Sequence, residues 1–425
     1  MKRTIPAWTP ILVLFLALGL ANPVLSQEIA IGRTVDSLLD YARNNNPEYA
    51  SMRYEADAAG ERVTPAGALP DPKLKIELMD ITKMGEQNAT LNPSRVGSTQ
   101  YTVTQELPWY GKRDLKREIA ELEAEGAQGR ARGSWAEIAA QLKTAHAQLY
   151  LLNHSEQLTR EILDLMVRLE KIAQVRYAGG LAMQQDVIRS QIEQTGMRND
   201  LIMLENDSNM LRARINMLLA RPTGAPITSP DALRPIPAPA QLDYATLEDR
   251  VRGRNPQLFA DEAKIKSAEK RRELAYKERY PDFMVGVTPV QFGSSIEEWQ
   301  LMVEFNIPLQ QSSRRAMERE SESMLAAARS RKEATANQVL SGLAENLSGI
   351  EAARRTEQLA TTSLLPQAEL TFNSALAAYE NGKVDFATLL EAQQQIRKAR
   401  LSKIKAQAEA QIRLAEIEKL LGEEL

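Results

Sequence analysis

The sequence contains no cysteine among its 425 residues. Disulfide bonds, thiol nucleophiles and cysteine-based metal sites are therefore excluded. Aromatic residues make up only 5% of the chain, and basic and acidic residues almost cancel, which leaves a formal net charge of −3. This balance gives no indication of a nucleic-acid partner. The chain is rich instead in Ala, Glu, Gln, Leu, Lys and Arg, and this composition favours long helices.

The first 26 residues have the pattern of a secretory signal peptide. Lys2 and Arg3 form a basic start, residues 11–20 are apolar, and cleavage is expected after Ser26. Because the apolar run is too short to span a bilayer, we expect a cleaved peptide and not a retained anchor. The mature chain is therefore expected to be exported.

Residues 27–220 combine helical and alternating segments. A helical segment that extends to about residue 66 is interrupted at Asn46-Pro47. Two later segments, about 73–81 and 100–107, alternate apolar and polar side chains, which predicts strands with one apolar face. The polar stretch between them has no period, so a loop is expected there.

A long helix follows, with no Gly or Pro from Ser134 to Tyr177. Its apolar residues recur at 4-3-4-3 spacing, which predicts left-handed coiled-coil packing. The helix is expected to break at Gly179-Gly180 and to return from about Gln184, so that a hairpin tip lies near 178–183. On the return helix, methionines at heptad spacing are expected to fill the core and not to bind a soft metal. The residues concerned are Ile138, Leu142, Ala145, Leu149, Leu152, Leu158, Ile162, Leu165, Leu169 and Ile172, with Met203, Met210 and Met217.

A linker at 221–240 contains six prolines and divides the chain into halves. The second half, 241–425, repeats the first. It has alternating segments at about 283–290 and 299–307, and a second hairpin tip is expected near 380–385.

Matching residues support this repeat. Asn255-Pro256 corresponds to Asn46-Pro47. The step from Tyr177 to Tyr379 equals the step from Leu218 to Leu420. Two matches at one offset indicate an internal duplication.

Four strands per chain cannot close a membrane barrel, and open sheet edges are not tolerated in lipid. The smallest single-chain barrels have about eight strands, so membrane strands here require an oligomer, and a trimer would supply twelve. The helix from Ser134 to Tyr177 would span about 65 Å at about 1.5 Å per residue, more than a bilayer, and it is too charged to enter one. The helices are therefore expected to project into an aqueous compartment.

Taken in this order, the segments resemble the outer-membrane factors of tripartite efflux and type I secretion systems, the TolC family. The strand-to-helix segment Gln105-Glu-Leu-Pro-Trp-Tyr-Gly-Lys-Arg113 and the two hairpin tips, 177–191 and 379–393, carry the resemblance. It covers essentially all of the mature chain. Residues 68–72 and the Pro-Trp-Tyr-Gly-Lys turn look most like the heavy-metal cation efflux branch.

The resemblance implies a mainly α fold with a small β part. Three chains would share a twelve-stranded transmembrane β-barrel and an antiparallel coiled-coil helical barrel of twelve helices. The homotrimer would sit in the outer membrane, in contact with its lipid, with a large periplasmic portion. It would work with a periplasmic adaptor and an inner-membrane pump of the RND type, without a cofactor. Its function would be to pass substrates to the outside, with heavy-metal cations as candidates.

The resemblance also implies site residues. Adaptor contact is expected at the tips, and acidic side chains are expected to narrow the tunnel at its periplasmic end. Thr388 departs from an aspartate found in some members, so Glu391 is preferred over Asp385 for the second tip. The tip residues are Gly180, Leu181, Ala182, Gly382, Lys383 and Val384, and the acidic candidates are Asp186, Asp385 and Glu391.

Two alternatives to an efflux channel for metal cations remain open, and an enzyme is considered as a further class. Within the channel class, the cargo could be a drug or a secreted protein. A soluble periplasmic coiled-coil protein would explain the heptads and the charge, but not four alternating strands in two pairs. An enzyme is not expected, because His146 and His154 stand eight residues apart and match no metal-protease or triad spacing.

Overall fold

The computed structural model describes residues 31–425, so the expected signal peptide lies outside the described residues. The described chain is mainly helical with one four-stranded sheet, which confirms the predicted fold class. The elements are α1 (Val35–Asn45), α2 (Pro47–Glu61), α3 (Val63–Gly67), β1 (Lys73–Met79), β2 (Ser98–Leu107), α4 (Lys112–Ala178), α5 (Gln184–Leu218), the short 3-10 helix η1 (Pro239–Leu242), α6 (Tyr244–Arg254), α7 (Pro256–Lys277), β3 (Phe283–Phe292), β4 (Ser295–Phe305), α8 (Gln311–Leu359), the π-helical turn η2 (Ala360–Leu364), α9 (Leu365–Glu380) and α10 (Phe386–Leu421).

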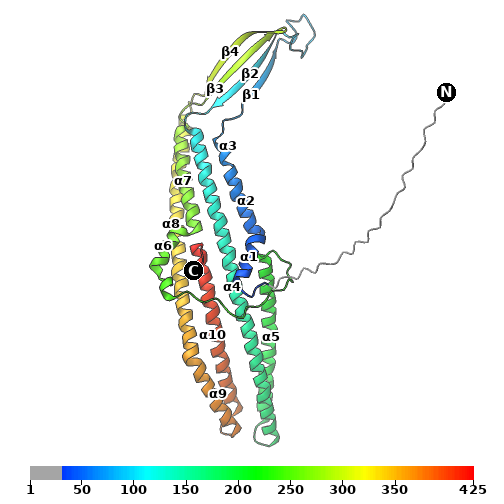
Figure 1. The fold of residues 1–425 in the computed structure, drawn as a ribbon, viewed down its shortest axis with the longest axis vertical. Helices are drawn as coiled ribbons and strands as arrows, with labels where there is room; N and C mark the ends of the chain where they lie inside the picture. Colours follow the sequence, from blue (N-terminus) through cyan, green and yellow to red (C-terminus); the bar gives the residue numbers. More distant parts are fainter. Residues whose placement is uncertain (1–30) are drawn as a thin grey trace, which may run out of the picture.

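These elements are arranged along one long axis (Figure 1). The sheet lies at one end, and the hairpin formed by α4 and α5 and the hairpin formed by α9 and α10 turn at the other. The helix α4 has 67 residues and is therefore about 100 Å long at about 1.5 Å per residue. In the second half, α8, η2 and α9 cover the same distance in succession.

α4 begins at Lys112, well before the Gly-free stretch that starts at Ser134, and it continues through three glycines on the way. At Gly129 an added Cβ would lie 2.9 Å from Cδ1 of Phe259 and 3.1 Å from Cβ of Ala260. Both neighbours are on α7, so a side chain at this position would force the two helices apart. The glycine is tolerated within the helix because it permits this close approach.

The sheet is antiparallel, with strand order β1-β2-β3-β4. Residues that pair across strands share a face, and one such row is apolar on every strand and exposed. On the opposite face Thr288 donates a hydrogen bond from Oγ1 to Oγ1 of Thr102 at 2.9 Å. The sheet thus has one exposed apolar face and one polar face. The apolar row consists of Leu74, Val103, Val287 and Leu301.

Two asparagines show that the repeat extends to the three-dimensional structure. Asn46 caps α2, and its Nδ2 donates to the carbonyl of Leu218 at 2.7 Å. Asn255 caps α7, and its Nδ2 donates to the carbonyl of Leu420 at 2.8 Å. Each asparagine is only 5% exposed and joins the start of one helix to the end of another. The equivalent steps in the sequence therefore correspond to equivalent contacts.

The heptad residues of α4 face the core, as their spacing predicts. Ile138, Leu142 and Leu149 are 2%, 0% and 1% exposed. The first heptad run packs with α1 and α5. The second run, from Leu158 to Ile172, packs mainly with α9 and α10.

The expectation for the methionine stripe is wrong for the single chain. Met203, Met210 and Met217 are 54%, 59% and 64% exposed on α5. The heptad spacing correctly marks an apolar face, but α5 lies at an edge of the bundle and packs mainly on α4. Within one chain its other face therefore remains uncovered.

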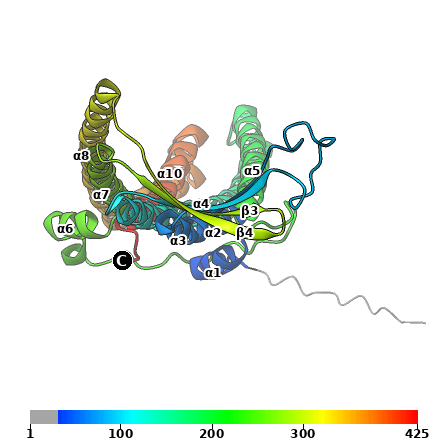
Figure 2. The same cartoon turned by 90° about the horizontal axis from the view of Figure 1, so that it is seen from above.

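Seen from above, the helices and the sheet curve around one side of the molecule (Figure 2). α1, α6 and the linker lie on the convex side. The linker is held there by a parallel bridge between Ile31 and Ile227 and by an ion pair of 2.6 Å between Arg234 and Glu418. In the described part of the chain, no helix has the length and apolar character needed to cross a membrane.

Candidate functional site: the hairpin tips and the strand-to-helix joint

The first hairpin tip is a left-handed turn at Gly180. The φ angle of Gly180 is +70°, a conformation that residues with a Cβ rarely adopt. The N–H of Leu181 donates to the carbonyl of Arg176 at 2.7 Å, which closes the end of α4. Leu181 is 70% exposed beyond this turn, and Ala182 is half-buried. The tip thus presents an apolar side chain on a fixed backbone.

The second tip repeats this geometry. Gly382 has a φ angle of +69°, and the N–H of Lys383 donates to the carbonyl of Ala378 at 2.8 Å. Here the exposed residue after the glycine is Lys383, a cation in place of Leu181, while Val384 is half-buried against the lower core. The two turns are equivalent in backbone but differ in charge.

Arg176 joins the two tips. Its guanidinium donates to the carbonyl of Glu380 in the second hairpin and, at 3.3 Å, to the carbonyl of Leu181 in its own. It also lies 5.0 Å from the centre of the Tyr379 ring, in cation–π geometry. The sequence analysis did not select Arg176, although an arginine in the last turn of a helix is a known carbonyl partner.

Two of the predicted acidic residues lie close together at this end. Burial raises the pKa of the Asp186 carboxyl above its ordinary value, and the nearby negative charge of Asp385 raises it too, against the opposing charges of Arg189 and Arg176. Asp385 caps α10 and accepts from the Oγ1 of Thr388 at 2.7 Å and from its N–H at 3.0 Å. These hydrogen bonds lower the pKa of Asp385. The two carboxyls therefore differ in acidity because their environments differ.

Tyr379 completes this cluster. Burial raises the pKa of its phenol, and the charge of Asp186 adds to the effect. Tyr379 is only 2% exposed and stacks edge-on against Phe386 at 5.6 Å between ring centres. It was noted in the sequence only as a marker of the repeat, and its contact with Asp186 required the folded chain.

Glu391 does not join the cluster. Its side chain is exposed and forms no ion pair or side-chain hydrogen bond with the described residues. The next two residues, Ala392 and Gln393, are buried, so Glu391 occupies the side of α10 that the chain itself leaves exposed. The structure brings Asp186 and Asp385 together and leaves Glu391 separate.

The Pro-Trp-Tyr-Gly-Lys turn forms the joint between sheet and helices. Lys112 is only 2% exposed, and its Nζ lies 3.0 Å from Asp282, 3.3 Å from Glu278 and 3.1 Å from the carbonyl of Tyr280. Asp282 also accepts from the N–H of Trp109 at 2.7 Å. The first residues of α4 are thereby fixed to the segment that leads into β3. The motif was visible in the sequence, but these partners were not.

The two histidines lie in different surroundings on α4. His146 is buried, which lowers the pKa of its imidazole, and His154 contacts the carbonyl of Tyr150. Over residues 31–425 no group of three or more His, Cys, Asp or Glu side chains is placed to hold a metal ion.

The sequence matches the outer membrane efflux protein family over residues 38–220 and 247–423. The chain belongs to this family. The two matched segments coincide with the two halves of the repeat, and the omitted stretch is the linker with its flanking residues. The protein is thus an outer-membrane efflux channel, as the sequence analysis predicted, and the soluble coiled-coil alternative is not favoured.

One characterised relative and several solved structures are similar to the chain over most of its length. The chain is 24% identical over 416 residues to the cobalt-zinc-cadmium resistance protein CzcC of Cupriavidus metallidurans, covering 94% of this chain and 92% of CzcC. Its fold is similar to that of CusC, with a TM-score of 0.79, 14% identity and 92% of both chains covered. The outer membrane protein VceC of Vibrio cholerae gives a TM-score of 0.78 and 16% identity, with 92% of this chain and 96% of VceC covered.

Proposed function

We propose that the chain works as a homotrimer whose sheets join into a twelve-stranded barrel in the outer membrane. The observation that carries this proposal is the exposed apolar face of a sheet whose outer strands, β1 and β4, have no partner within the described chain. An open edge cannot stand in lipid, because its backbone groups would remain without hydrogen bonds. Pairing β1 of one chain with β4 of the next removes both edges and turns the apolar rows toward lipid.

The helices offer matching edges. α5 exposes its methionine stripe on one side of the bundle, and Leu359, Leu364 and Leu370 are exposed around α8 and α9 on the other. Two uncovered apolar edges on opposite sides of one chain fit a closed ring. In the trimer the α5 edge of each chain would pack against the α8–α9 edge of the next, to form a twelve-helix tunnel.

The tips are proposed as the docking site for a periplasmic adaptor, which links the channel to an inner-membrane pump of the RND type. The contact residues would be Gly180, Leu181, Ala182, Gly382, Lys383 and Val384. Their support is geometric, because the two turns share one backbone conformation and Arg176 holds them side by side. The repeat of one turn at two positions suits an adaptor that binds several equivalent sites.

The acidic constriction is proposed to consist of Asp186, Asp385 and Glu391. Three copies of each carboxyl around an axis would draw cations and repel anions. The proximity of Asp186 and Asp385 supports the pair as its core, because two neighbouring carboxyls raise the local negative charge.

The proposed cargo is a heavy-metal cation, passed to the outside without any catalysed reaction. The relative CzcC is a resistance protein for cobalt, zinc and cadmium, and it matches this chain over almost its whole length. Cation-attracting tips are consistent with this cargo. A drug or a secreted protein as cargo is the alternative outcome in the tests below.

Single-channel recording in a planar bilayer tests the channel and its constriction. Purified trimers should give cation-selective steps, and Asp186→Asn should reduce this selectivity. Glu391→Gln separates the contributions, because Glu391 lies apart from the pair. Steps with unchanged selectivity in both variants would leave the channel and refute the constriction. Metal tolerance of cells that produce the protein with its pump would separate metals from other cargoes.

Adaptor docking is tested by site-specific crosslinking in cells. Gly180→Asp combined with Gly382→Asp should abolish crosslinks, because both glycines have positive φ angles and the new charges occupy the tips. Gly224→Asp is the matched control, since this glycine lies in the linker with open space around it. Normal crosslinking in correctly inserted tip variants would refute docking at the tips.

A further inference from the structure

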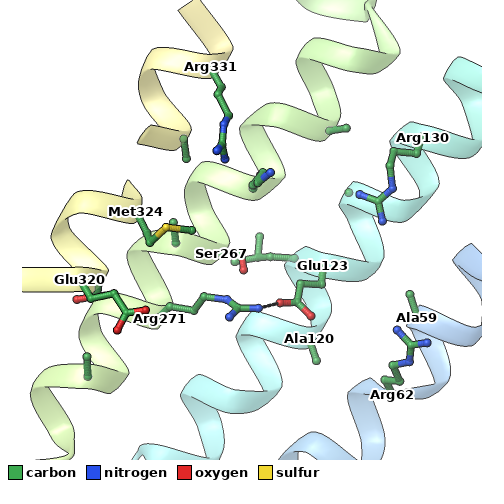
Figure 3. Close-up of a pocket in the computed structure, with 18 of the residues that line it drawn as sticks. Ala59, Arg62, Ala120, Glu123, Arg130, Ser267, Arg271, Glu320, Met324 and Arg331 are labelled. Carbon is green, nitrogen blue, oxygen red and sulfur yellow. Dashed lines mark hydrogen bonds and ion pairs between the residues drawn. The ribbon is translucent and has the colours of Figure 1, made fainter. Parts of the chain in front are cut away.

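The half of the bundle next to the sheet contains a groove of about 660 Å³ between α2, α4, α7 and α8 (Figure 3). Small residues such as Gly126, Ala260 and Ala268 form its floor. Charged side chains surround this floor, and positive charge exceeds negative charge by three. The cations are Arg62, Arg130, Lys264, Arg271 and Arg331, and the acids are Glu123 and Glu320.

Most of these cations have no acidic partner. Arg271 pairs with Glu123 (Figure 3). The other four cations, Arg62, Arg130, Lys264 and Arg331, form no ion pair or side-chain hydrogen bond with any residue in 31–425. Each of the four is exposed at the groove. The groove therefore gathers positive charge that the chain itself does not neutralise.

The same helices pair their charges elsewhere. Lys332 of α8 lies 2.6 Å from Glu262 of α7, and Arg329 lies 2.8 Å from Glu269. These helices therefore carry enough acidic residues to pair cations elsewhere, and the lack of acidic partners is specific to the groove. Like charges on four packed helices repel one another, and a bound anion would relieve this repulsion.

We propose that this groove binds a compact anion with two or more negative charges on carboxylate or phosphate groups. Guanidinium groups suit these ligands because they donate two parallel hydrogen bonds to one oxyanion group. Three of the four unpaired cations are arginines, and they come from the junction of α2 and α3, from α4 and from α8. The volume is ample for such an ion, and the small floor residues let it approach the helix backbones.

This inference has a consequence for transport that rests on the proposed trimer. Three grooves would form a positive belt in the wall of the tunnel, between the acidic tips and the sheet. A bare belt would repel a metal cation. An anion held in each groove cancels this repulsion, so that passage of a cation would depend on the anions present.

Titration calorimetry on the purified full-length protein tests the binding site directly. The probes are citrate and pyrophosphate in a buffer free of divalent metals, and they distinguish carboxylate from phosphate ligands. We expect at least one probe to bind at one site per chain, more weakly as sodium chloride increases. Arg130→Gln combined with Arg331→Gln should weaken this binding by about tenfold or more. Both side chains are exposed and unpaired, so the fold should tolerate the change.

Arg329→Gln is the matched control. Arg329 lies on α8 two residues before Arg331, but it pairs with Glu269 away from the groove, so its loss should leave affinity unchanged. The absence of binding by both probes would overturn the proposal, as would equal affinity in the double variant. Because calorimetry measures binding and not conduction, failure of the anion site and failure of the channel assignment give separate results.

Discussion

Replacement of Lys112 by methionine tests the joint between sheet and helices. Met has about the length of the Lys112 stem, so the substitution removes the charge with little change in packing. The ammonium group makes two ion pairs and one hydrogen bond to a carbonyl, at 3.0 to 3.3 Å. Its removal also leaves the carboxylate of Asp282 with only the N–H of Trp109 as a hydrogen-bond partner among the described residues.

The expected loss of stability depends on how exposed the two acidic partners of Lys112 are. Breaking a fully buried ion pair costs about 3–5 kcal/mol, because an unpaired charge stays in the interior. Here the side chains of Glu278 and Asp282 are 43% and 46% exposed, so water can solvate them once Lys112 is gone. We therefore expect a loss nearer to that of one or two charged hydrogen bonds, about 2–3 kcal/mol.

Denaturant-induced unfolding of the purified protein, followed through the fluorescence of Trp109 and its neighbours, measures this loss. Trp109 stacks on Tyr280 at 5.1 Å between ring centres, so its emission reports on the joint. Lys116→Met is the matched control, because Lys116 lies one turn further along α4 and is exposed. The reasoning would be refuted if Lys112→Met and Lys116→Met differed in unfolding free energy by less than about 0.5 kcal/mol.

Three further predictions follow from the other contacts. Asn46→Ala and Asn255→Ala should each lower the free energy of unfolding by about 2–3 kcal/mol, because each removes a helix cap and a buried hydrogen bond. Denaturant unfolding measures this loss, with Asn45→Ala as the control. An equal loss in the control would contradict the prediction. Met210→Lys should convert trimers to monomers in sedimentation, because it places a charge in the proposed contact between chains, and intact trimers would argue against that edge. The pKa of Asp186 is raised in the folded chain, so ionisation of its carboxyl lowers the stability of the fold. This loss of stability is absent below the ordinary pKa of 3.8 and is complete above the pKa of the folded state. The stability gained by Asp186→Asn should therefore grow from acidic to neutral pH, and a gain independent of pH would contradict the shift.

Local pattern was sufficient to predict much of the fold. Alternation located the four strands, and the heptads identified the buried face of α4. β1 ends at Met79, two residues before the expected end, and β4 begins at Ser295, four residues before the expected start. Strand ends depend on pairing with a neighbour, which a single segment does not encode.

The candidate site was predictable only in part. Gly180 and Gly382 were visible because a break between two long helices requires a left-handed residue. Arg176 and Tyr379 were missed because their partners lie about two hundred residues away, at the end of the other hairpin. The methionines were misread for a related reason: a heptad identifies an apolar face but not whether the same chain or another one covers it.

The hydrogen bonds of Asn46 and Asn255 have a consequence for the reach of the molecule. Each fixes the end of a returning helix, at Leu218 or Leu420, to the upper part of its own repeat. The part of the molecule below these two anchor points consists mainly of helical hairpin, with α1, α6 and the linker packed against its first turns. Adding one heptad to every descending and every ascending helix would lengthen the tunnel by about 10 Å and leave the sheet, the joint and the anchors in place. The length of the hairpins, measured from the two asparagines, thus sets how wide a compartment the channel can cross.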